Sequence, residues 1–209
     1  MGYTGKGKTR AWQRMLSGRR LDLIDPSPVD VEIEDIAHGL ARVARWNGQT
    51  KGEHAYSVAQ HSLLVLDIAG RMFDDLTPDK QLMVLLHDAP EYVVGDMISP
   101  FKAVMGGEYK HVEARLLGAI HMRFGLPANT PVRLKSKIKK ADRCAAYYEA
   151  TLLAGFSEKE ALQFFGLPAD DKPARRLLKP MPASEAQNAF LQAFHAIEKM
   201  RTQPSEGKG

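Results

Sequence analysis

Residues 77–91 read Thr-Pro-Asp-Lys-Gln-Leu-Met-Val-Leu-Leu-His-Asp-Ala-Pro-Glu, and the expected fold follows from this stretch. Thr77 is a candidate N-cap, and Pro78 suits the first helical position because an amide there has no helical partner. The leucines that follow predict one buried helix face. Since a proline disfavours helical geometry in the residue before it, Ala89-Pro90 marks an irregular end. We therefore expect a helix that ends in the doublet His87-Asp88.

Similar helical signals recur along most of the chain. Apolar residues spaced by three and four predict helices from residue 33 to the Gly48 region, from about 55 to 72, over 108–124, and from Thr130-Pro131 to Gly155. The spacings from Ser157 to Glu160 and from Ser184 to Gln187 are typical of capping boxes. Only the alternation around Leu21 and Leu23 suggests a short extended segment. We expect an all-α, single-domain helical bundle of about seven helices.

Composition narrows the class of protein. The 209 residues are 44% hydrophobic and 26% charged with a net charge of +4, which excludes intrinsic disorder. No apolar run reaches the roughly 18 to 20 residues that span a bilayer, and the N-terminus lacks the apolar core of a secretory signal. The single cysteine, Cys144, cannot form an internal disulfide. These features lead us to expect a cytoplasmic protein.

The chain divides by composition into three segments. We expect a basic N-terminal arm at residues 1–30, a helical domain at 31–200 and a flexible tail at 201–209. Six Lys and Arg residues lie in the first twenty positions. Because the excess of positive charge over the whole chain is small, we favour a solvated arm over one that binds nucleic acid.

Histidines and aspartates on the expected helices suggest a metal site. His61 lies seven residues after His54, so the two share a face if the second helix includes both. Asp142 lies on the apolar side of the long helix, where a buried carboxylate needs a partner. With the doublet His87-Asp88, two imidazoles and two carboxylates suit one divalent ion, such as Mn²⁺, Co²⁺, Zn²⁺, Fe²⁺, Ni²⁺ or Mg²⁺. The other histidines are expected at the surface or satisfied in the core: His38, His111, His121 and His195.

Three segments carry a family resemblance. They are Tyr56-Ser-Val-Ala-Gln-His61-Ser62, Leu85-Leu-His-Asp-Ala-Pro-Glu91 with Gly95-Asp96, and Lys140-Ala-Asp142. Together they resemble the HD-domain metal-dependent phosphohydrolases, and are most similar to the branch of bacterial 5′-deoxynucleotidases and YfbR-like proteins. The resemblance covers about residues 33–155 and implies the HD-domain fold. It also implies four metal ligands: His61, His87, Asp88 and Asp142.

The resemblance also assigns residues around the expected metal. Glu91 matches the acidic residue that handles a proton near the activated water, and Asp96 matches a second carboxylate near substrate and water. Arg45 and Trp46 match the pair that lines the nucleotide site. Lys102 follows the Asp96 loop and is a further candidate for substrate binding.

The implied activity is removal of phosphate from nucleoside 5′-monophosphates, especially deoxyribonucleotides, by metal-activated water. The expected partner is a small phosphorylated substrate, with no membrane, no nucleic acid and a homodimer as one option. The alternatives are hydrolysis of nucleoside triphosphates or of an alarmone of the ppGpp type, and a non-catalytic module that senses nucleotides. Glu91 and Asp96 argue against the sensor, because a structural four-ligand site gains nothing from two further carboxylates.

Overall fold

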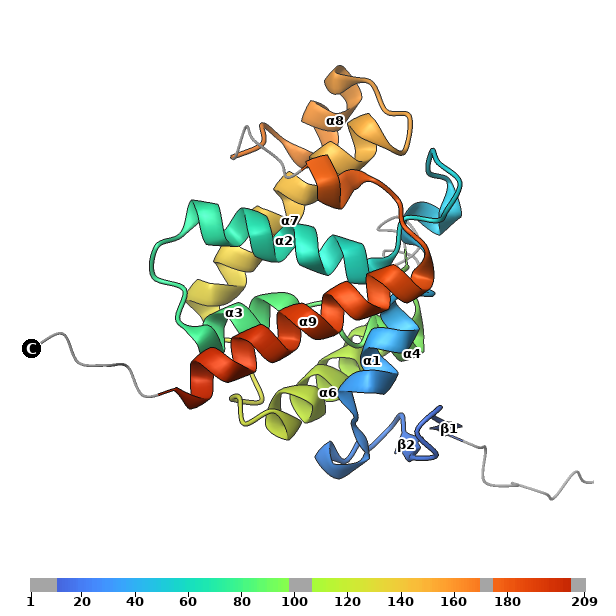
Figure 1. Cartoon of the computed structure of the whole chain (residues 1–209), viewed down its shortest axis with the longest axis vertical. Coiled ribbons are helices and arrows are strands. Elements are labelled where there is room, and N and C mark those ends of the chain that lie inside the picture. Colours follow the sequence, from blue (N-terminus) through green and yellow to red (C-terminus); the bar gives the residue numbers. More distant parts are fainter. Residues whose placement is uncertain (1–10, 98–106, 170–174, 204–209) are drawn as a thin grey trace, which may run out of the picture.

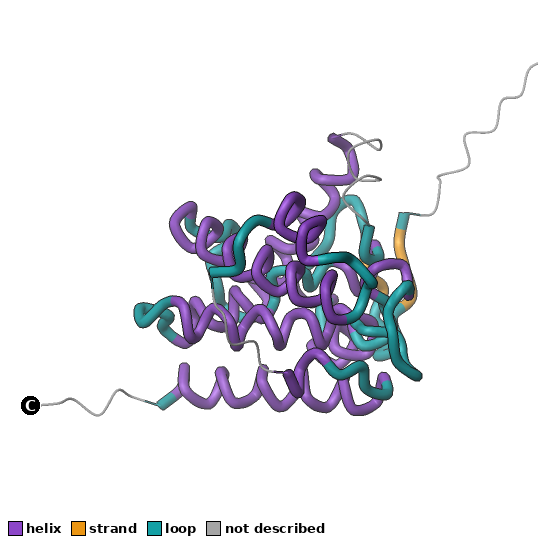
Figure 2. Tube along the Cα trace, turned by 90° about the horizontal axis from the view of Figure 1, so that it is seen from above, coloured by secondary structure: helices purple, strands orange, loops and turns teal. Residues whose placement is uncertain are grey.

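The structure, a computed structural model, describes residues 11–97, 107–169 and 175–203. The predicted all-α architecture is confirmed, with eight α-helices in these residues against the expected number of about seven (Figures 1 and 2). They are α1 (Ile33–Leu40), α2 (Val58–Met72), α3 (Pro78–Leu85), α4 (Glu91–Val94), α6 (Gly107–Arg123), α7 (Val132–Leu152), α8 (Glu158–Phe165) and α9 (Ala183–Thr202). Short 3-10 helices occupy Pro28–Asp30, Arg45–Gly48 and Arg175–Leu178, and a hairpin joins β1 (Trp12–Arg14) to β2 (Arg20–Asp22).

Helix α2 is the centre of the bundle. It packs against α7, α3 and α9, and α9 runs across α2 and α3 in Figure 1. Because neighbours surround it, α2 buries most of its first ten residues, including the polar Gln60, His61 and Ser62. Polar groups in such a position need partners, which makes the start of α2 the natural place for a functional site.

Helix α2 begins later than the sequence pattern predicts. Ser57 is its N-cap, with a side chain that accepts a hydrogen bond of 3.3 Å from the amide of Gln60. His54 therefore lies in the preceding loop, and the expectation that it shares a helix face with His61 is wrong.

Helix α1 ends at Leu40 and does not reach the Gly48 region. The amide of Arg45 donates to the carbonyl of Tyr56 at 2.8 Å, and the amide of Val58 donates to the carbonyl of Val43 at 3.0 Å. This extended pairing uses backbone groups that a longer helix would need, so α1 ends early. The same pairing places residues 43–45 beside the start of α2. Arg45 is thereby carried to the same place as His61.

Two predicted helix starts are confirmed and two are wrong. Pro78 occupies the first turn of α3, and the capping box between Ser157 and Glu160 is present at α8. Helix α9 instead begins at Ala183 with Pro182 as its N-cap, so Ser184 lies inside the first turn and forms no cap with Gln187. Helix α7 starts one residue later than expected, at Val132, with Pro131 as its N-cap.

The hairpin packs on α1 at the opposite end of the molecule from α8 (Figure 1). Leu21 and Met15 are buried, and Ser17 donates to the Asp35 carboxylate from its amide at 2.9 Å and from its hydroxyl at 2.5 Å. The described part of the expected arm, residues 11–30, therefore includes a folded segment. None of the helices within the described ranges has the length and apolar character required to cross a bilayer.

Helices α1 and α4 approach closely at a glycine. A Cβ atom at position 39 would lie 2.8 Å from the Cβ of Tyr92 and 3.0 Å from its carbonyl oxygen. The absence of a side chain at Gly39 thus lets α4 sit against α1, and Glu91, the first residue of α4, is placed by this contact.

Candidate metal centre

Three elements bring the four expected ligands together. His61 lies in the first turn of α2, the doublet His87-Asp88 in the turn after α3, and Asp142 in the middle of α7. His61, His87 and Asp88 offer ligand atoms that all lie within 4.8 Å of one another. Asp88 Oδ2 is 3.4 Å from the Nε2 atom of each histidine, and Asp142 Oδ1 is 3.2 Å from His61 Nε2.

Both imidazoles are oriented by a bond at Nδ1. His61 Nδ1 lies 2.5 Å from Glu149 Oε1, and His87 Nδ1 lies 2.8 Å from the carbonyl oxygen of Val84. An ionised carboxylate and a carbonyl accept hydrogen bonds only, so each Nδ1 donates and each Nε2 keeps its lone pair in the neutral ring. Both Nε2 atoms are buried, and their nearest polar neighbours are the carboxylate oxygens of Asp88 and Asp142. Two such nitrogens beside carboxylate oxygens fit a divalent cation.

Electrostatics favours a positive charge at this point. Burial and Arg45 lower the pKa of His61, but the carboxylates of Glu149, Asp142 and Asp88 around the ring raise it well above its ordinary value. For Asp88, burial raises the pKa, while His87 and His61 outweigh it and hold the pKa well below the usual range. The Asp88 carboxylate is therefore ionised and stabilises a positive charge beside it.

Glu149 is the functional residue that the sequence reasoning missed. Its side chain is fully buried, and its Oε2 atom accepts from Trp46 Nε1 at 2.9 Å and from Arg45 Nη2 at 3.3 Å. Burial raises the pKa of Glu149, but His61 and Arg45 lower it to about 2. The spacing of seven residues from Asp142 was the available signal, because it places both carboxylates on one face of α7.

Arg45 and Trp46 occupy a turn with unusual backbone geometry. Trp46 has a φ of 56° and Asn47 a φ of 50°, the left-handed region that costs a non-glycine residue about 1–3 kcal/mol. The Trp46 ring packs edge-on against Phe156 at 5.5 Å and Phe165 at 5.9 Å between centroids. Such strain persists only where surrounding contacts hold the side chain in place.

Arg45 lies between carboxylates. Its Nη1 atom is 3.5 Å from Asp96 Oδ1, on the side away from Glu149. Burial lowers the pKa of Arg45, but the carboxylates, Glu149 first and then Asp96, raise it above its ordinary value. Arg45 is therefore a permanent cation, and Asp96 is placed where it orients Arg45.

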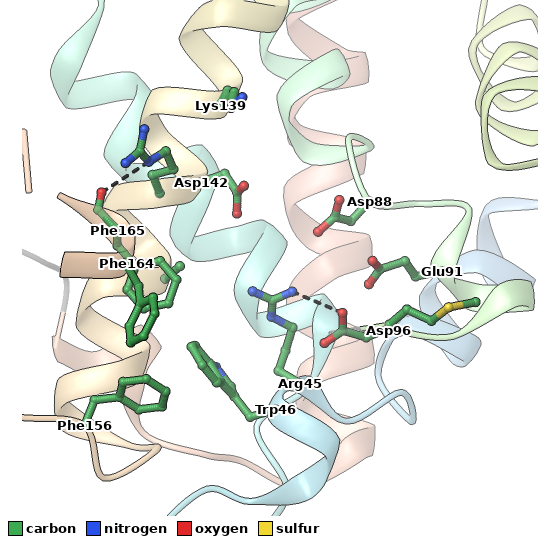
Figure 3. A pocket seen from close by; sticks show the side chains of 13 residues that line it. Arg45, Trp46, Asp88, Glu91, Asp96, Lys139, Asp142, Phe156, Phe164 and Phe165 are labelled. Atoms are coloured by element: carbon green, nitrogen blue, oxygen red, sulfur yellow. Dashed lines mark hydrogen bonds and ion pairs between the residues drawn. The ribbon is translucent and has the colours of Figure 1, made fainter. Parts of the chain in front are cut away.

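These residues surround one cavity of about 610 Å³ (Figure 3). Carboxylates gather on one side and aromatic rings on the other, with Arg45 between them. The lining consists of Arg45, Trp46, Asp88, Glu91, Asp96, Met97, Lys139, Asp142, Arg143, Ala146, Phe156, Phe164 and Phe165.

The structure thus brings together all the expected site residues that it describes. The buried His61 and the partly buried His87 lie behind the cavity. The residues that line it are Asp88, Asp142, Glu91, Asp96, Arg45 and Trp46. Lys102 lies outside the described residues. Lys139 and Arg143 of α7 are further cations at the cavity.

No family model matches the chain. The chain is 54% identical over 188 residues to an uncharacterised protein of Rhodobacter capsulatus, and the match covers 90% of this chain and 96% of that protein.

Proposed function

The chain belongs to one family with the Rhodobacter capsulatus protein, and we propose that it is a divalent-metal-dependent phosphohydrolase of the HD type. One observation carries the proposal. Two imidazoles, each with Nδ1 hydrogen-bonded, direct Nε2 toward the same oxygen of Asp88 at the wall of a cavity. His61, His87, Asp88 and Asp142 would hold the cation. When bound, it makes a water more acidic and polarises a phosphoryl oxygen.

The residues of the chain supply the remaining steps. Glu91 is 1% exposed, lines the cavity and lies near Asp88 in Figure 3. Glu91 takes the proton from the attacking water. Arg45, held by Asp96 and Glu149, binds the phosphoryl oxygens and stabilises the charge that grows on them in the transition state.

The cavity supports a small nucleotide as substrate. Its volume of about 610 Å³ lies within the range of about 300–1,000 Å³ that small-molecule sites occupy. The aromatic wall of Trp46, Phe156 and Phe164 suits a flat base, while Arg45 binds the phosphate. Nucleoside 5′-monophosphates, deoxyribonucleotides first, combine both features.

The test is a screen for product release by metal-loaded protein. Purified protein is stripped of metal, reloaded with Mn²⁺, Co²⁺, Zn²⁺ or Mg²⁺, and supplied with nucleoside mono-, di- and triphosphates and ppGpp. Inorganic phosphate from monophosphates alone is the expected result. Tripolyphosphate or pyrophosphate as product would assign the alternative hydrolases. Tight nucleotide binding with no product under any metal would assign the sensor.

A pair of aspartate variants separates the site from general effects. Asp88→Asn removes a ligand and should abolish turnover. Asp67→Asn makes the same chemical change on the surface of α2, where Asp67 pairs with Arg71, and should keep turnover. Full activity of Asp88→Asn would rule out the site.

A further inference from the structure

One buried carboxylate joins the two sides of the cavity. Glu149 Oε1 contacts His61, a ligand of the cation, while Glu149 Oε2 contacts Trp46 and Arg45, which line the substrate side. We propose that Glu149 is a positioning residue that couples the cation site to the substrate wall. The inference rests on the cation site of the proposed function and adds the group that sets its geometry.

On the cation side, Glu149 selects the form of His61 that can bind metal. The contact of 2.5 Å at Nδ1 keeps the proton on that nitrogen. The lone pair of the neutral ring then lies on Nε2, 3.2 Å from Asp142 Oδ1 and 3.4 Å from Asp88 Oδ2. A partner of this kind fixes both the tautomer and the orientation of a histidine ligand.

On the substrate side, Glu149 holds the strained turn. The Trp46 indole donates its N–H to Oε2 at 2.9 Å, and this bond fixes how the ring is oriented at the cavity. The same oxygen accepts from Arg45 Nη2 at 3.3 Å and Nε at 3.4 Å. Because Trp46 has a φ of 56°, its orientation depends on such contacts.

Only an ionised carboxylate satisfies both sides together. His61, Trp46 and Arg45 all donate, so both oxygens of residue 149 must accept. A glutamine offers one acceptor and one donor. When metal binding turns its oxygen toward His61 Nδ1, its NH₂ group faces the N–H groups of Trp46 and Arg45 and releases them.

The experiment uses Trp46 as its own reporter. The chain has two tryptophans, and Trp12→Phe in the N-terminal hairpin leaves Trp46 as the single one. In this background, the full-length protein with and without Glu149→Gln is titrated with Zn²⁺ by calorimetry. Acrylamide quenching of Trp46 is then measured at saturating Zn²⁺. In the Glu149→Gln protein we expect the Zn²⁺ dissociation constant to rise by about 10- to 100-fold. We also expect acrylamide to quench the fluorescence of Trp46 more strongly.

Asp35→Asn is the matched control. Asp35 is also a buried carboxylate whose two oxygens accept separate hydrogen bonds, both from Ser17, but it lies beneath the hairpin. The same acid-to-amide change there should leave Zn²⁺ affinity and Trp46 quenching unaltered. A folded Glu149→Gln protein with either quantity unchanged would overturn the proposal.

A second variant covers a failure to fold, and the choice of measurements separates this proposal from the proposed function. If Glu149→Gln does not fold, Glu149→Asp keeps the charge on a side chain one methylene shorter, which cannot reach His61 and Trp46 together. Retention of both wild-type quantities in that variant refutes the coupling. Neither measurement depends on turnover, so a protein that hydrolyses no phosphate ester but follows these expectations refutes the proposed function alone.

Discussion

The contact between α1 and α4 allows a substitution outside the proposed metal site to test how Glu91 is placed. A Cβ at position 39 would lie 2.8 Å from Tyr92 Cβ and 3.2 Å from its Cα. Since relaxed carbon contacts are about 3.5–4.0 Å, Gly39→Ala requires α4 to withdraw by about 0.7–1.2 Å. Glu91 precedes Tyr92 and moves with it. A displacement of about 1 Å in a catalytic group can cost about 10²-fold in rate.

Gly39→Ala should also lower the stability of the protein. Replacing a helical glycine by alanine gains about 1 kcal/mol in helix propensity, while overpacking costs about 1–3 kcal/mol. Gly39→Ala should therefore lower the free energy of unfolding by up to about 2 kcal/mol, or Tm by up to about 8 °C for a chain of this length. Thermal denaturation and phosphate release by the metal-loaded protein measure the two effects.

Gly70→Ala is the control for helix propensity. Gly70 lies in α2, and a Cβ there would have no neighbour within 4 Å. That variant should gain up to about 1 kcal/mol and keep its activity. If Gly39→Ala matched Gly70→Ala in both stability and turnover, the contact would not position Glu91.

Three other perturbations address the metal, the pH dependence and the N-terminal cap of α8. Mn²⁺ at about 100 times its dissociation constant should stabilise the stripped protein by about 2.7 kcal/mol, and Asp88→Asn should lose most of that gain; Tm with and without Mn²⁺ measures it. Burial lowers the pKa of His121 below 6.5, although the carbonyls of Pro127 and Ala128 raise it. Its stabilising effect is complete above pH 6.5 and is lost as pH falls through the folded-state pKa, because protons then bind the unfolded chain preferentially. His121→Asn should flatten the dependence of unfolding free energy between about pH 7.5 and 5.5, measured by urea denaturation, and an unchanged slope would contradict this. Ser157→Ala removes the cap of α8 and should cost about 1 kcal/mol in chemical denaturation, whereas an unaltered midpoint would show that the capping box does not stabilise α8.

The sequence was a good guide where the signal was local. Periodic apolar residues predicted most helices, and the proline at position 78 and the capping box at Ser157 marked two starts correctly. Prediction failed where tertiary pairing decided the outcome. Val43 continued the helical period, yet its carbonyl bonds to the amide of Val58, and that bond ends α1 early. The Ser184 pattern fitted a capping box, but the helix already starts at Ala183.

The same division applies to the candidate site. The four proposed ligands stand out because histidine and carboxylate on apolar helices are unusual, and the family resemblance pointed to Glu91. Glu149 is equally buried, but nothing beside it in the sequence suggests a partner. The spacing of seven residues between His54 and His61 was misleading, because His54 lies in a loop. The same spacing between Asp142 and Glu149 places both carboxylates on one face of α7, and Glu149 contacts His61. Only the packing of α7 on α2 shows that Glu149, and not His54, belongs to the candidate site.

The bond between His61 and Glu149 also has a consequence for folding. It joins residues 88 positions apart, so the chain must close a long loop before the proposed cation site can form. Closing such a loop is entropically unfavourable until many other contacts have formed. The site is therefore assembled after α7 docks on α2, and a nascent chain that has not yet exposed residue 149 lacks the group that prepares His61. Acquisition of the cation would mark the completion of folding rather than its start.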